Sequence, residues 1–158
     1  MINRQSVLKV KLEVDTNPPG KFSTEMKYVF SPVQFAVRVF TLPSSFAGKV
    51  HALLYRNWKN RVKGRDWYDF AWYASHNPVL DLQHLEERMR QSGNYQDEAP
   101  LTKEVMNMHI LDAIDNLNVD QARREVMPFV NDVRELDIWS KDFFRAAAGR
   151  IELTGDEI

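Results

Sequence analysis

The amino-acid sequence predicts an α+β fold, in which a small antiparallel or mixed sheet at the N-terminus precedes a helical bundle. Two observations predict this order. Apolar and polar residues alternate within the first 41 residues, whereas from residue 42 nearly to the end apolar residues recur every three or four positions. We therefore expect one domain spanning residues 1–158, with the sheet in residues 1–41 and the helices in residues 42–158.

Composition excludes several classes of protein. The 158 residues carry a formal net charge of −1 and no cysteine. The near-neutral charge gives no overall attraction to nucleic acid or to anionic membranes, and without cysteine there are no disulfides, catalytic thiolates or cysteine-based zinc sites. No apolar run approaches the roughly 20 residues that span a bilayer, and the N-terminus lacks the apolar block of a signal peptide. These features predict a cytoplasmic protein without a membrane partner.

The first expected strand covers residues 8–14, in which every second residue is apolar. Glu13 and Asp15 would then point to the same side, about 7 Å apart at their Cα atoms, and the paired prolines that follow would end the strand. Further strands are expected at residues 27–30 and 35–39. Because so small a sheet needs a cover, either the helices cover it or another chain, a second copy or a different polypeptide, adds strands at its exposed edge.

Two helices joined by a basic turn at residues 57–64 form the centre of the helical part. The first helix follows Pro43, because proline is tolerated in a first helical turn. Apolar residues at helical spacing predict one buried stripe on each helix. The stripes comprise Phe46, Val50, Leu53 and Leu54 on the first helix, and Trp67, Phe70, Ala71 and Ala74 on the second.

Further helices are predicted from capping residues and apolar spacing. They are expected to begin after Asp81, Thr102, Asp120 and Ser140. The helix after Asp81 is expected to run to about Gln91, and the one after Thr102 to Leu117. Residues 93–100 have the composition of a loop, and the tail at residues 153–158 is expected to fray.

Two groups of residues could bind a metal ion or a phosphate. Glu13 and Asp15 offer hard oxygen ligands of the kind that Mg²⁺ prefers, although charged residues on a strand face are more often simply solvated. Lys49 lies among small residues, so a phosphate would fit beside its ammonium group, and the alternative is an ordinary surface lysine. Asp66 opens the second helix, where a carboxylate is also favoured by the helix dipole. The spacing predicts that Lys49 and Asp66 face a shared cleft.

The basic turn could bind RNA. Arg56 and Arg65 flank a run of further cations that is interleaved with tryptophan, so phosphates and a stacked base could both be held there. The alternative is a solvated loop over a packed tryptophan. The residues concerned are Tyr55, Arg56, Trp58, Lys59, Arg61, Lys63, Arg65 and Trp67. The four histidines show no metal-ligand spacing, and His51 is expected to line the helical hairpin.

Five segments together resemble the AbiEii/AbiGii toxin family of nucleotidyltransferase-like proteins. LKVKLEVDTNPP resembles a strand of that family that supplies a carboxylate, GKVHALLYR its lysine helix, and KGRDWYDF its Arg-Asp-x-Tyr-Asp helix. DQARREVMPFVND and LDIWSKDFF resemble its C-terminal helices. The resemblance implies part of a polymerase-β-like nucleotidyltransferase, with Lys49 on the nucleotide phosphates, Asp66 as the essential acid and Asp15, with Glu13 as a further option, on the metal side. Arg56 and Arg65 are expected to help bind the nucleotide or RNA.

The resemblance also implies binding partners and a missing part of the active site. Members of the family begin with a Gly-Ser helix motif and a strand with a paired Asp-x-Asp, and this sequence contains neither. The chain therefore resembles the C-terminal portion of a longer toxin, expected to be inactive alone and to use Mg²⁺ only when its site is completed. The implied partners are a nucleoside triphosphate, an RNA acceptor such as tRNA, and a cognate antitoxin or a complementing N-terminal fragment. The alternatives are a non-catalytic module that binds RNA or antitoxin, and a decayed pseudo-enzyme.

Overall fold

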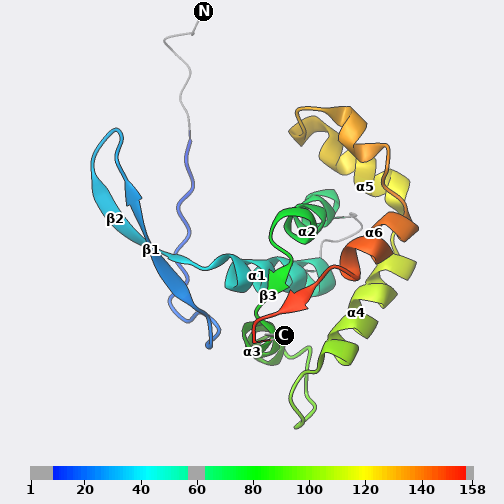
Figure 1. The fold of residues 1–158 in the computed structure, drawn as a ribbon, viewed down its shortest axis with the longest axis horizontal. Helices are drawn as coiled ribbons and strands as arrows, with labels where there is room; N and C mark the ends of the chain where they lie inside the picture. Colours follow the sequence, from blue (N-terminus) through cyan, green and yellow to red (C-terminus); the bar gives the residue numbers. More distant parts are fainter. Residues whose placement is uncertain (1–8, 57–62, 156–158) are drawn as a thin grey trace, which may run out of the picture.

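The structure, a computed structural model, describes residues 9–56 and 63–155. Residues 9–41 form an N-terminal arm that extends from a helical body made of the remaining described residues (Figure 1). The arm contains strands β1 (Thr24–Val29) and β2 (Phe35–Phe40), which pair antiparallel with Thr24 opposite Phe40. A small antiparallel sheet thus precedes helices, and the predicted α+β class is confirmed.

The predicted strand at residues 8–14 is wrong. Residues 9–14 lie in no strand, and Leu8 is outside the described residues. Val10, Leu12 and Val14 are 81%, 86% and 76% exposed, so none of them has a buried face. The alternating pattern alone does not form a strand, because the backbone also needs a neighbouring strand to pair with. The two observed strands form the only pair that the described part of the arm contains.

Six α-helices make up most of the helical body. They are α1 (Leu42–Tyr55), α2 (Gly64–His76), α3 (Leu82–Gln91), α4 (Lys103–Asp115), α5 (Val119–Val126) and α6 (Lys141–Ala148). Helix α1 packs against α2, α3 and α4, while α2 also contacts α5 and α6. Two 3₁₀ helices, η1 (Met127–Phe129) and η2 (Val133–Leu136), link α5 to α6. Among the described helices, none combines the length and the apolar character that crossing a membrane requires.

Side-chain caps define the starts of four helices. Asp81, Thr102 and Ser140 each accept a hydrogen bond from the backbone N–H three residues later, as their residue types predict. The predicted cap at Asp120 is wrong, because the chain enters α5 two residues earlier. Asn118 accepts the hydrogen bond from the Gln121 N–H at 3.0 Å, and Asp120 lies in the first helical turn.

The C-terminal end pairs with a distant segment of the body. Strand β4 (Glu152–Leu153) lies parallel to β3 (Val79–Leu80), and the Thr154 N–H donates to the Leu80 carbonyl at 3.0 Å. The predicted frayed tail is therefore wrong for Leu153, which lies in β4, and for Thr154, whose N–H is hydrogen-bonded to Leu80. The rest of that predicted tail includes residues 156–158, which lie outside the described residues.

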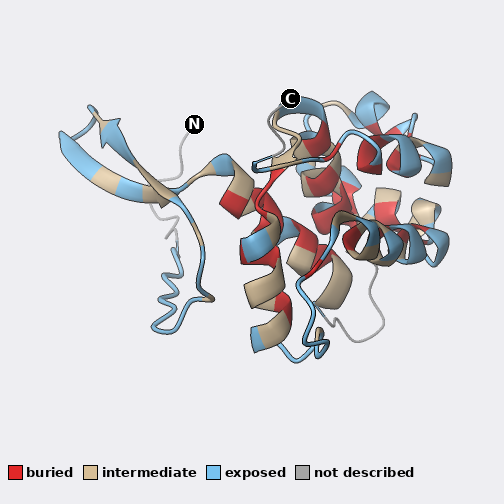
Figure 2. Ribbon diagram, turned by 60° about the horizontal axis from the view of Figure 1, so that its bottom comes forward, coloured by how far each residue is buried: buried red, intermediate tan, exposed pale blue. Residues whose placement is uncertain are grey.

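The hydrophobic core lies entirely within the helical body. No described residue of the arm is buried, whereas buried positions occur on every α-helix of the body (Figure 2). Phe46, Phe70 and Phe144 are almost completely buried, and Trp67 packs edge-on against the last two. Gly64 marks a close approach of α2 to α5, because a Cβ there would lie 2.3 Å from the Ala122 carbonyl oxygen.

A polar junction attaches the arm to the body. The buried Ser44 hydroxyl donates to the Asp81 carboxylate at 2.9 Å and accepts from the Ser23 N–H at 2.9 Å. A second hydrogen bond joins the buried His84 ring to the Gly20 carbonyl at 2.8 Å. These bonds fix the base of the hairpin against the starts of α1 and α3, and so place the end of β2 beside a pocket.

Candidate functional site

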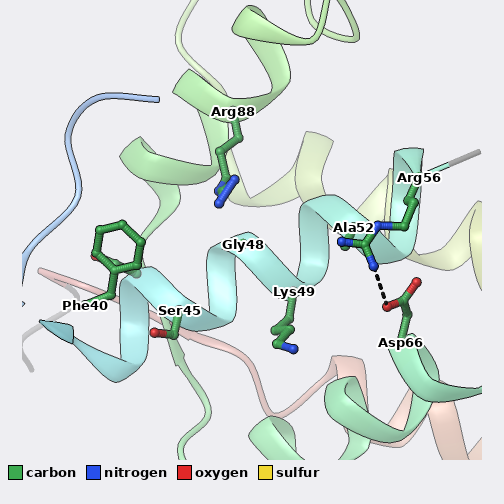
Figure 3. A pocket seen from close by; sticks show the side chains of 9 residues that line it. Phe40, Ser45, Gly48, Lys49, Ala52, Arg56, Asp66 and Arg88 are labelled. Carbon is green, nitrogen blue, oxygen red and sulfur yellow. Dashed lines mark ion pairs between the residues drawn. The ribbon is translucent and has the colours of Figure 1, made fainter. Parts of the chain in front are cut away.

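A pocket of about 290 Å³ lies beside α1, where the start of α2 and the middle of α3 approach it (Figure 3). Its wall on α1 consists of small side chains, Ser44, Ser45, Gly48 and Ala52, and Phe40 from the end of β2 lines it at the arm. Around this apolar and hydroxyl-bearing wall lie three cations and one carboxylate, which are Lys49, Arg56, Arg88 and Asp66. The pocket thus offers room and positive charge for an anionic ligand.

Lys49 reaches the pocket from the exposed side of α1. Its Nζ lies 2.7 Å from Oδ2 of Asp69 on α2, and both side chains are substantially exposed. An exposed pair of this kind contributes at most about 1 kcal/mol to stability. The ion pair therefore positions the ammonium group without burying it, and leaves it accessible to a ligand.

Asp66 is the buried acid of the pocket. Burial raises the pKa of its carboxyl group, and the charge of Asp69 raises it further. The positive charges of Arg56, Lys63 and Lys49 act in the opposite direction but do not reverse the shift. The nearest cation, Arg56, places Nη1 3.8 Å from Oδ1, which is a loose ion pair. A carboxylate with a raised pKa accepts a proton more readily than an ordinary aspartate, as a general base must.

The carboxylates predicted for a metal lie outside this pocket. Asp15 accepts a hydrogen bond from the Asn17 N–H at 3.0 Å, and its charge acts on Arg88 without lining the pocket. Glu13 forms an ion pair with Lys11. Across residues 9–56 and 63–155 there is no group of three acidic or histidine side chains that could hold a metal ion. The described residues therefore do not by themselves fit a Mg²⁺ site.

The structure describes only part of the predicted basic turn, and the residues that it describes do not lie together. Arg65 stacks its guanidinium 4.1 Å from the centre of the Phe129 ring, so it does not join Lys49 and Arg56 at the pocket. Lys63 donates to the carbonyls near the end of α1, and Trp67 is buried in the core. Trp67 is therefore unable to stack on a base. Trp58, Lys59 and Arg61 lie outside the described residues.

One charged residue of the pocket was not predicted from the sequence. Arg88 of α3 lines the pocket, and the only sequence signal was its position three residues after the inward-facing Leu85. His51, expected to line the hairpin, hydrogen-bonds Ser92 at 2.9 Å. Burial, with the charge of Arg88 next in importance, lowers the pKa of His51 to about 4. Its imidazole is therefore neutral at physiological pH.

Comparisons with known proteins agree with the resemblance seen in the sequence. Neither the curated proteins nor the solved structures include a match to the chain. A family model described as nucleotidyl transferase AbiEii toxin, type IV TA system, matches residues 3–148, which is nearly the whole chain. The chain therefore belongs to the AbiEii family of nucleotidyl transferase toxins of type IV toxin–antitoxin systems.

Proposed function

We propose that this chain supplies the lysine and one acid of a site that transfers nucleotides from a nucleoside triphosphate to an RNA acceptor, with tRNA as the acceptor. The observation that supports the proposal most directly is that Lys49 of α1 and Asp66 of α2 line the same pocket. They come from the two segments whose sequences resemble the lysine helix and the Arg-Asp-x-Tyr-Asp helix of the family.

Each of these side chains has a distinct role in the proposal. The Lys49 ammonium binds the nucleotide phosphates as a point charge, and its ion pair with Asp69 keeps it at the pocket. Asp66 positions the attacking hydroxyl and accepts its proton, a role that suits its raised pKa. Arg56 lies against Asp66 and adds positive charge where phosphates would enter.

The metal in this proposal depends on a second polypeptide. Phosphoryl transfer of this type uses divalent ions held by carboxylates. The described residues do not form such a site, and the whole sequence has no Asp-x-Asp pair. We therefore expect Mg²⁺ and the missing aspartates to come with a complementing fragment that carries the Gly-Ser and Asp-x-Asp motifs, and we expect the isolated chain to be inactive.

The test is reconstitution with the polypeptide encoded immediately upstream. We expect the mixture, but neither polypeptide alone, to transfer labelled nucleotide from a triphosphate to tRNA in the presence of Mg²⁺. Lys49→Ala and Asp66→Asn should each lower the transfer rate by about 100-fold or more, as removal of a transition-state contact does. Arg124→Ala is the control, because Arg124 is exposed on α5 away from the pocket. A stable complex that transfers no label would refute the proposal.

A second candidate function is a non-catalytic binding module, and the arm is the observation that favours it. Tyr28, Phe30 and Phe35 are 68%, 75% and 52% exposed on the hairpin, a surface suited to a protein partner such as a cognate antitoxin or a second copy. Titration of tRNA at two salt concentrations distinguishes RNA binding from protein binding, because phosphate contacts weaken steeply with salt. The binding module would be favoured if the chain binds a protein partner but no tRNA, and if Phe30→Ser abolishes that protein binding.

A further inference from the structure

We propose that Arg88 of α3 is a phosphate-binding residue of the pocket, holding the triphosphate of the nucleotide from the side opposite Lys49. This inference rests on the proposed function, since it takes the pocket to be the nucleotide site. It assigns to the site a third helix that carries none of the segments in which the family resemblance was seen. The support comes from the position of Arg88, its missing partners and the charges around it.

The Arg88 guanidinium group lies over α1 at Gly48 (Figure 3). A Cβ at that glycine would lie 3.2 Å from Nη2 and 3.4 Å from Cζ and Nε of Arg88. A Cβ at this position would require the guanidinium to shift by a few tenths of an ångström. Ser45 and Ala52, one turn to either side of Gly48, are also small residues that line the pocket. Arg88 therefore lies against α1 where the helix carries no side chain.

Arg88 has no protein partner among the described residues. Its buried Nε–H donates to no acceptor, and within the described residues Arg88 forms no ion pair. Its neighbour Arg90, by contrast, pairs with Glu86 at 2.8 Å and also donates to two backbone carbonyls. A guanidinium that is half removed from water without an acceptor is unfavourable. A phosphate would satisfy it, because the planar group donates two parallel hydrogen bonds to phosphate oxygens.

Positive charge gathers around Arg88. Arg88, Arg56 and Lys63 together act on His51, whose pKa is lowered to about 4 chiefly by burial and then by these charges. Three cations thus lie close enough to His51 of α1 to act on it. The neighbouring acids are Asp66, which is buried in the pocket, Asp69, which is paired with Lys49, and Asp15 in the arm, which acts on Arg88 electrostatically. A polyanion such as a triphosphate fits this excess better than a single carboxylate does.

The test uses inorganic tripolyphosphate as the probe and the full chain, with binding measured by calorimetry. We expect Arg88→Ala to weaken binding by about 10-fold or more, the loss typical of a charged hydrogen bond, and Arg88→Lys to recover only part of it, because lysine lacks the paired donors. Arg124→Ala is the charge-matched control and should bind like the unmodified chain. Unchanged affinity in Arg88→Ala, or an unmodified chain that binds no tripolyphosphate, would overturn the inference.

Gly48→Ala separates a binding role from a structural one. Alanine is a better helix former than glycine, and the flexible guanidinium can shift by a few tenths of an ångström, so the free energy of unfolding should not fall, whereas the affinity for tripolyphosphate should fall if Arg88 binds it. If Arg88 instead serves to hold the arm through Asp15, Arg88→Ala and Asp15→Asn will destabilise the chain equally and leave the affinity unchanged, which overturns the inference. If the reconstituted complex with Arg88→Ala transfers nucleotide at the rate of the unmodified complex, the inference about Arg88 is also overturned, while the proposed function stays intact.

Discussion

The arm and the helical body use apolar residues in opposite ways. In the body, large side chains such as Phe70 and Phe144 are almost completely buried, whereas in the arm Val10, Leu12 and Phe30 are mostly exposed. Both regions show a regular apolar pattern in the sequence. The body buries its pattern because the partner surfaces lie in the same chain. In the arm, the Phe22 and Phe40 rings at the base of the hairpin lie 5.8 Å and 6.1 Å from the His84 ring of α3, whereas the apolar residues farther along the arm stay exposed. Stability therefore comes from the body, and the arm is the surface available for binding.

Matched removal of an aromatic ring from each region tests this contrast most strongly. Phe70→Ala should lower the free energy of unfolding by about 3–5 kcal/mol, because it leaves a cavity in the core. Phe30→Ala should change it by less than about 0.5 kcal/mol, since this ring is 75% exposed. Urea denaturation followed by circular dichroism measures both. Equal losses in the two variants would show that the arm is packed in solution.

A pair of glycines gives the next largest difference. Gly64→Ala should cost about 3 kcal/mol, because the new methyl group would collide with the Ala122 carbonyl and neither helix backbone moves easily. Gly20→Ala in the arm should change stability by less than about 0.5 kcal/mol, since no atom lies within 4 Å of its added Cβ. Thermal unfolding compares the two. A stable Gly64→Ala variant would mean that α2 and α5 are not in the contact described.

The pH dependence of stability tests the charges within the body. The unfolded chain binds a proton at His51 near pH 6.5, and the folded chain only near pH 4. Because the unfolded state binds more protons between these values, stability should fall as the pH is lowered through this range. The loss should be on the order of 1–2 kcal/mol once solvent screening is allowed for. His51→Gln should reduce the slope, and an unchanged slope would exclude His51 as its source.

The smallest effect is expected at Asp66. Burial raises the pKa of this carboxyl group, so the folded state holds its proton more tightly and stability falls as the pH rises through the shifted pKa. Asp66→Asn should therefore be more stable than the unmodified chain at neutral pH, by about 0.5–1 kcal/mol, as is common at functional sites. The gain should diminish at low pH, where the acid is protonated in both states. A less stable variant at neutral pH would mean that the Arg56 ion pair outweighs burial.

Local signals in the sequence predicted most of the body and less of the arm. The helix starts after Asp81, Thr102 and Ser140 were predictable because a capping side chain acts on a backbone N–H only three residues away. The predicted strand at residues 8–14 was wrong because a strand depends on a pairing partner that alternation does not specify.

Prediction of the pocket residues also depended on whether the signal was local in the sequence. Lys49 and Asp66 could be predicted to share a cleft, since apolar spacing places them on two successive helices. Arg88 could not, because its place in the pocket depends on how α3 crosses α1 at Gly48. The contact between Arg65 and the Phe129 ring could not be predicted either, because it depends on where η1 lies in the fold.

The parallel pair formed by β3 and β4 has a consequence for synthesis. Residues 79–80 can form this pair only after residues 152–153 have been made, because the two strands lie far apart in the sequence. A nascent chain can therefore assemble α1 to α3 before the backbone of residues 79–80 has its strand partner. A variant truncated before residue 152 would keep its pocket residues but could not form the β3–β4 pair.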